Sequence, residues 1–142
     1  MKGSKLIALA TAIALVLLAV GCTAAQPAAQ LPDGTFTAGP SDDQVETTLA
    51  AGRYKSTLVS VLNTSVIEEG TFVVKDDQIT FTQEKASGAL AVVCGSTDKP
   101  YTYKWTFDQQ AKTITFVNVD DPCDARRSRR ESGPLPYKAQ TK

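Results

Sequence analysis

The sequence predicts an all-β domain: an antiparallel meander of seven to eight strands that closes into an up-and-down barrel, with one short helix near the N-terminus. After Gly52, apolar and polar residues alternate at a period of two, which is the pattern of half-buried strands. Short turn sequences separate these segments, so successive strands pair as hairpins. Closure into a barrel removes the exposed edges that an open sheet would leave.

The segments before that point are short. A turn signal at 32–34 precedes a first strand over 35–37. Ser41-Asp42-Asp43-Gln44 has the spacing of a helix capping box, and Gly52 stands where a glycine cap ends a helix. We therefore expect a helix over 42–51 that packs a narrow apolar stripe against the barrel.

The later strands follow from the alternating segments and the turns between them. They are expected over 54–62, 66–75, 78–83, 89–93, 101–107, 113–116 and 135–137. The last of these contains Pro136 and follows Pro134, and proline weakens strand pairing. The hairpin over 101–116 holds the only Trp and most of the heavy aromatic surface.

Aromatic residues dominate the face of these strands that we expect to point inward. Eight strands enclose just enough space to be filled by side chains or to hold one small ligand. The sequence therefore leaves open whether the aromatic residues are a packed core or the wall of a cavity for a small apolar ligand. The residues concerned are Phe72, Phe81, Tyr103, Trp105, Phe107 and Phe116.

The N-terminal segment has the features of an export signal. Lys2 and Lys5 precede an uncharged run over 6–20, which is short for a membrane span. The run ends at Gly21-Cys22, which resembles a bacterial lipobox. This implies a signal peptide over 1–21, lipid on Cys22, membrane anchoring outside the cytoplasm and a flexible tether over 22–32. The alternatives are an ordinary secretory signal cut nearby or a retained transmembrane anchor.

The chain has three cysteines. If Cys22 carries lipid, Cys94 and Cys123 remain as a pair in an oxidising compartment. A disulfide closing a loop of about 30 residues would stabilise the fold by about 3.6 kcal/mol in the chain-entropy model. Two free thiols or a metal pair are the alternatives, and the absence of His and of a Cys-x-x-Cys motif disfavours metal.

Charge is unevenly distributed although the chain is neutral overall. Residues 22–125, which include the barrel domain expected over 33–125, carry 14 acidic and 7 basic residues. Residues 126–142 carry 6 basic residues and 1 acidic residue, and we expect them to form a basic tail. Such a tail is either solvated or binds anionic lipid or wall polymer. Nucleic acid is not an expected partner outside the cell, and we expect a monomer.

The residue types argue against an enzyme and against a cofactor. With no His, the Ser-His-Asp and Cys-His systems are excluded. Three carboxylate pairs, Glu68-Glu69, Asp76-Asp77 and Asp120-Asp121, flank turns, and adjacent residues of a strand point to opposite faces. Asp120, Asp121 and Asp124 lack the glycine and glutamate spacing of a calcium loop. An ion pair of Asp121 with Arg126 is the expected use of that carboxylate.

Several motifs in fixed order resemble a family of small bacterial lipocalin-like domains. They are a Gly-Thr-Phe hairpin at Gly70, a Tyr103-Lys104-Trp105 strand, and Asp120-Asp121-Pro122-Cys123 followed by Arg126. The resemblance covers about residues 34–127 and implies a barrel outside the cytoplasm, without fixing a ligand. Where the family continues into a last apolar strand, this chain has an arginine-rich run, which leaves barrel closure open.

Two classes of function follow from these observations. The first is a lipoprotein whose barrel is a non-catalytic module that binds a small apolar ligand. The second is a structural or interaction lipoprotein with a filled core that works through its surface and basic tail. An empty apolar cavity of a few hundred cubic ångströms inside the barrel would distinguish the first class from the second.

Overall fold

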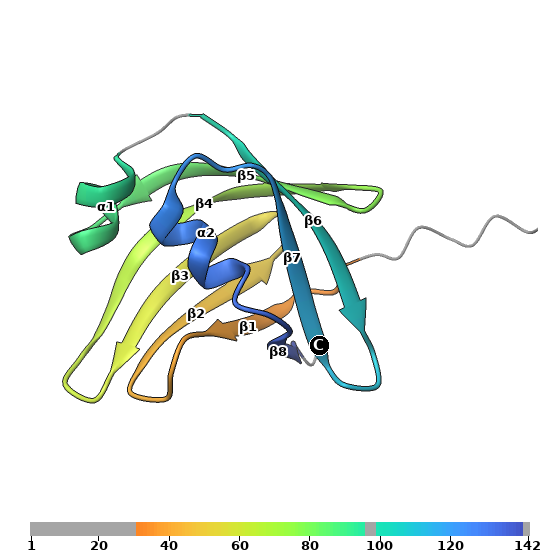
Figure 1. The fold of residues 1–142 in the computed structure, drawn as a ribbon, viewed down its shortest axis with the longest axis horizontal. Helices are drawn as coiled ribbons and strands as arrows, with labels where there is room; N and C mark the ends of the chain where they lie inside the picture. The colour runs from red at the N-terminus through yellow and green to blue at the C-terminus, as the bar shows by residue number, and fades with distance from the viewer. Residues whose placement is uncertain (1–30, 96–98, 141–142) are drawn as a thin grey trace, which may run out of the picture.

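The computed structural model describes residues 31–95 and 99–140. The predicted signal peptide, Cys22 and nearly all of the predicted tether lie outside these residues. Eight antiparallel strands form one closed barrel in the order of the sequence, as predicted, and two short helices accompany them (Figure 1). The elements are β1 (Gly34–Ala38), β2 (Asp43–Ala50), β3 (Arg53–Ser60), β4 (Thr64–Lys75), β5 (Gln78–Ala86), α1 (Gly88–Cys94), β6 (Tyr101–Asp108), β7 (Thr113–Asp120), α2 (Asp124–Arg130) and β8 (Leu135–Ala139).

The last strand closes the barrel. β8 pairs with β1, where Phe36 lies opposite Tyr137, and with β7, where Ile114 lies opposite Leu135. The closing strand expected over 135–137 is therefore present. Because β8 is hydrogen-bonded to β7 on one side and to β1 on the other, neither β1 nor β8 is left as an edge strand.

Connections alternate between the two ends of an up-and-down barrel. The β1–β2 and β3–β4 connections lie at the same end as both helices, and we call this the helical end. The β2–β3, β4–β5 and β6–β7 turns lie at the other end, with the start of β1 and the end of β8. The chain thus enters the barrel at the end opposite the helices (Figure 1).

The prediction of a helix over 42–51 is wrong, because most of this segment is strand β2. Every second side chain from Val45 to Leu49 is buried, which is the period of a strand. Ala51 and Gly52 have positive φ angles of 50° and 76°, so they form a two-residue hairpin turn rather than a helix cap. Pairing with β1 and β3 on both sides outweighs the local capping signal.

The segment predicted as a strand over 89–93 is helix α1. Ala and Leu are strong helix formers, and only Leu90 of this helix is buried. A run of small and apolar residues bounded by Gly88 and Gly95 does not by itself distinguish a buried strand from a short helix.

The prediction of a basic tail over 126–142 is also wrong, because most of this segment is part of the folded domain. Its first residues form α2, and 135–139 form β8. Arg126 and Arg130 are four residues apart, so they share one helix face, and each is only 4% exposed. The barrel domain therefore continues beyond residue 125, where we predicted its end, to Ala139.

Closely packed side chains fill the barrel interior. Phe81 stacks on Tyr101 with ring centroids 5.4 Å apart, and Phe36 contacts Phe116 at 5.0 Å. Of the residues predicted to face inward, two are only partly buried and pack against the core, namely Phe72 and Phe107. The other four are buried: Phe81, Tyr103, Trp105 and Phe116.

Candidate functional site

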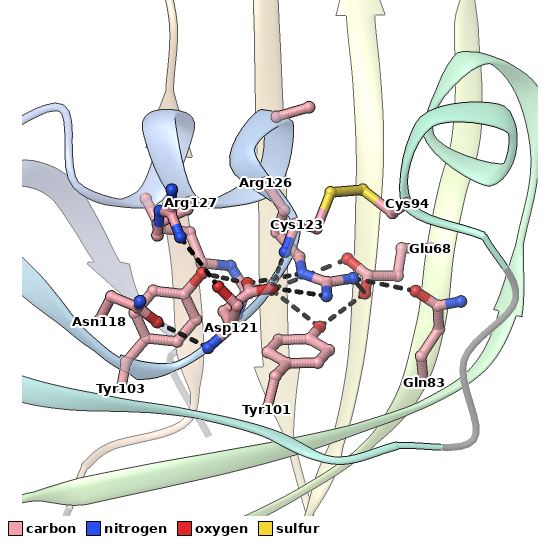
Figure 2. Close-up of polar contacts among 12 residues, drawn as sticks. Glu68, Gln83, Cys94, Tyr101, Tyr103, Asn118, Asp121, Cys123, Arg126 and Arg127 are labelled. Carbon is pink, nitrogen blue, oxygen red and sulfur yellow. Dashed lines mark hydrogen bonds and ion pairs between the residues drawn. A yellow bond between two sulfur atoms is a disulfide. The ribbon is translucent and has the colours of Figure 1, made fainter.

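Buried charged and polar side chains form a cluster beneath α2, next to the aromatic core. Arg126 is its centre (Figure 2). Its Nε and Nη2 donate to the Asp121 carboxylate at 2.8 and 2.9 Å. Its Nη1 donates to Oε1 of Glu68 and to Oε1 of Gln83, both at 3.0 Å. The guanidinium also lies over the Tyr101 ring, 3.6 Å from its centroid.

The connection between β7 and α2 holds Asp121 in place. The backbone N–H of Asp121 donates to the Asn118 side chain at 2.8 Å, and the N–H of Cys123 donates to Asp121 Oδ1 at 2.9 Å. Tyr103 also donates its hydroxyl proton to Asp121 Oδ2. The ion pair between Asp121 and Arg126 that the sequence predicted is confirmed.

The alternation of β4 places Glu68 in the interior, on the same strand face as the buried Gly70 and as Phe72, which packs against the core. The register between β3 and β4 shifts after Ser56, so Ile67 is a bulge residue with no partner of its own on β3. The bulge therefore adds Ile67 to the buried residues beside Glu68. Glu69 points away and meets Lys85 at 3.5 Å, so the two adjacent carboxylates do not converge.

Glu68 is the second anionic centre of the cluster. Tyr54 and Tyr101 donate hydroxyl protons to its Oε1 at 3.0 and 2.6 Å. Its Oε2 lies 3.8 Å from Nη2 of Arg130, whose guanidinium stacks over the Phe81 ring at 4.0 Å. Two guanidinium groups thus balance two carboxylates, and a buried charge cluster is tolerated only when it is paired in this way.

The pKa values follow from this pairing. Burial alone would raise the pKa of Asp121, but hydrogen bonds from Arg126, Tyr103 and the Cys123 N–H outweigh it and hold that pKa below its usual value. Burial raises the pKa of Tyr101 and that of Tyr103 above the ordinary tyrosine value. The Tyr101 and Tyr103 hydroxyls therefore stay protonated as donors, and the Asp121 carboxylate stays ionised as an acceptor. This is the arrangement of a structural ion-pair network.

The disulfide predicted between Cys94 and Cys123 is present. It joins the end of α1 to the residue before α2, with 5.2 Å between the two Cα atoms. The two helices of the helical end are therefore held together covalently, beside the ion-pair network (Figure 2).

Two of the cavities at the helical end are lined by α1 and α2. A small one of about 20 Å³ lies beneath α2 and is lined in part by Thr47, Ser56 and Arg130. A larger groove of about 220 Å³ separates α1 from the start of β4. Apolar side chains are also exposed here, at the β3–β4 connection and on α1: Val61, Leu62, Val92 and Val93.

Sequence reasoning missed three members of the network: Glu68 as an inward residue, Gln83 and Arg130. The spacing of Arg126 and Arg130 was a signal, because four residues place two side chains on one helix face. It was hidden in a run of arginines that is typical of a solvated tail. Glu68 also had a signal, because it stands four residues before Phe72 on the same strand face, but we interpreted it as part of a carboxylate pair that flanks a turn.

Within residues 31–95 and 99–140, no three His, Cys, Asp or Glu side chains come close enough together to hold a metal ion. No helix of these two ranges is both long enough and apolar enough to cross a membrane. Comparisons with protein-family models, curated proteins and solved structures gave no match. Fold and site therefore define the class: a closed eight-stranded antiparallel barrel with an ion-pair network beneath a helix.

Proposed function

We propose that this protein is a monomeric, membrane-anchored extracytoplasmic lipoprotein with a lipocalin-like barrel. In this proposal the barrel is a non-catalytic binding module that acts through its helical end, without a ligand cavity in its interior. The observation that carries the proposal is the filled interior. Tyr103 and Phe81 are 0% exposed and Trp105 is 4% exposed in the core of the barrel.

Cavity size supports a module that binds outside the barrel core. Pockets for drug-sized ligands usually measure about 300–1,000 Å³. The cavity beneath α2 measures about 20 Å³, far too little for such a ligand. The groove beside α1, at about 220 Å³, is open to solvent and lies outside the aromatic core.

The position of the N-terminal segment supports a helical end that faces away from the membrane. If Cys22 is lipidated, residues 22–30 separate the membrane from the described domain, and nine extended residues reach at most about 30 Å. Because β1 begins at the end opposite the helices, this short tether would hold that end near the membrane. The disulfide agrees with an oxidising compartment.

Trp105 fluorescence tests the filled interior. Long-chain fatty acids and similar apolar probes should leave the emission of Trp105 unchanged, and the emission should peak at the short wavelengths of a buried indole. Trp105 is the only Trp, so the signal has one source. Saturable quenching by a long-chain probe with one-to-one stoichiometry would show a ligand inside the barrel and refute the proposal.

Mass spectrometry of the mature N-terminus tests the anchor. Acyl chains are expected on Cys22, and Cys22→Ser should leave unprocessed precursor. Cys94→Ser is the matched control, because it removes a cysteine without touching the predicted processing site. An unmodified N-terminus downstream of residue 22 would contradict the lipoprotein assignment.

A further inference from the structure

We propose that the helical end binds a small ligand that carries one carboxylate and a short apolar chain. This inference rests on the proposed function, because it names the class of ligand that the helical end would take. The chain would lie in the groove beside α1, and the carboxylate would enter the cavity beneath α2.

The groove offers an apolar surface of suitable size for a short chain. Leu58 and Ile67 line it from β3 and β4, and Leu90 and Val93 line it from α1. Val93 is 64% exposed and its neighbour Val92 is 85% exposed, so α1 presents an apolar surface beside the groove. Removing this surface from water would favour binding in proportion to the area covered.

The two cavities adjoin, because Ile67, Leu90 and Arg129 line both. A ligand in the groove therefore has one end next to the smaller cavity. That cavity has room for one small polar group. Thr47 and Ser56 also line it, and their hydroxyl oxygens lie 2.8 Å apart.

Arg130 is the residue that would bind the carboxylate of the ligand. Its side chain is about 95% buried, and it lines the smaller cavity. Its Nη1 is fully buried and has no hydrogen-bond partner, whereas Nη2 contacts Tyr101 and Glu68. A buried guanidinium N–H without an acceptor is energetically unfavourable, so a carboxylate oxygen placed there would stabilise it.

The net charge of the site favours a ligand with a single negative charge. The four buried charges of the network cancel, since Arg126 and Arg130 balance Glu68 and Asp121. Arg129 is exposed on the rim shared by the two cavities and makes no ion pair within the described residues. One positive charge is therefore left at the site, and a single carboxylate would balance it.

Binding of octanoate to the full chain as exported, held in lipid nanodiscs, tests this inference, with empty nanodiscs as the blank. Isothermal titration calorimetry should show one saturable site with a Kd on the order of 0.1–1 mM for a ligand of this size. Octanol, which lacks the charge, and acetate, which lacks the chain, should each bind at least about tenfold more weakly.

Two pairs of surface variants locate the site. Arg129→Gln should weaken octanoate binding about tenfold, whereas Arg53→Gln, at an exposed arginine of β3 paired with Glu84, should not change it. Val93→Asp should abolish binding, whereas Val73→Asp, at a valine of β4 with 67% exposure, should not. All four positions are exposed, so the variants should fold.

The outcomes separate this inference from the proposed function. Equal binding of octanol and octanoate, or no saturable binding at ten times the expected Kd, overturns the carboxylate site and means that water satisfies Arg130. Neither result bears on whether the barrel interior is filled, so the proposed function would stand. If octanoate instead shifts the NMR signal of the Trp105 indole and not those of α1, the ligand lies inside the barrel, and both proposals fail.

Discussion

Arg126 and Asp121 meet through two parallel hydrogen bonds of 2.8 and 2.9 Å, five residues apart in the chain and on either side of Cys123. The pair links α2 to the end of β7, and the remaining donor of Arg126 reaches across the barrel to Glu68 on β4. One side chain thus connects the last helix to the middle of the sheet. The two-point contact also fixes the direction in which α2 crosses the barrel end.

Replacing Arg126 should be strongly destabilising. Arg126→Met keeps an apolar stem but leaves Asp121 and Glu68 buried with too few partners, which costs about 3–5 kcal/mol. Urea denaturation followed by circular dichroism measures the free energy of unfolding. Arg127→Met, at the neighbouring arginine that pairs with the exposed Asp124, should cost less than about 1 kcal/mol. Equal losses in both variants would show that the network does not hold the fold together.

Acid should weaken the fold through Asp121. The pKa of this carboxyl is held below its usual value, so its pairing stabilises the folded state above the unfolded-state pKa of about 3.9. This contribution is lost as the pH falls through the lower folded-state pKa. Asp121→Asn should therefore be less stable than wild type at pH 7, with a smaller difference at pH 2. A difference that stays constant across that range would contradict the prediction.

Trp105 should be a major contributor to stability. Its side chain is 4% exposed, and Trp105→Ala would leave a large cavity in a tightly packed core, at about 3–5 kcal/mol. Thermal and urea unfolding give the loss. Trp105→Phe keeps most of the volume and should lose clearly less. A loss below about 1 kcal/mol in the alanine variant would mean that the interior is looser than the packing indicates.

Breaking the disulfide should loosen the helical end and lower global stability. The double variant Cys94→Ala with Cys123→Ala opens a loop whose ends are 29 residues apart, which costs about 3–4 kcal/mol in the chain-entropy model. Hydrogen exchange should rise first in α1, because only Leu90 of that helix is buried. Non-reducing peptide mapping should link the two cysteines in the wild type, and free thiols in exported protein would contradict the pairing.

Much of the site could not be predicted, for reasons that lie in the geometry of the chain. Asp121 and Arg126 are close in sequence, so their pairing followed from local spacing. Glu68 is 58 residues from Arg126, and although the alternation of β4 places it on the inner face, only the closed barrel brings it to the guanidinium. No local pattern records a long-range contact of that kind. The role of Arg130 likewise depends on where α2 crosses the barrel.

The sequence by itself determined the strand alternation and the inward side of Trp105, which rest on a periodicity that each segment carries locally. It favoured barrel closure and the Cys94–Cys123 pair, and the tertiary structure decided both. Only the tertiary structure decided that 42–51 is a strand and that the arginine-rich run is a helix with two buried guanidiniums. In both places the local preference was weak. Pairing with neighbouring strands settled the first, and burial against carboxylates and aromatic rings settled the second.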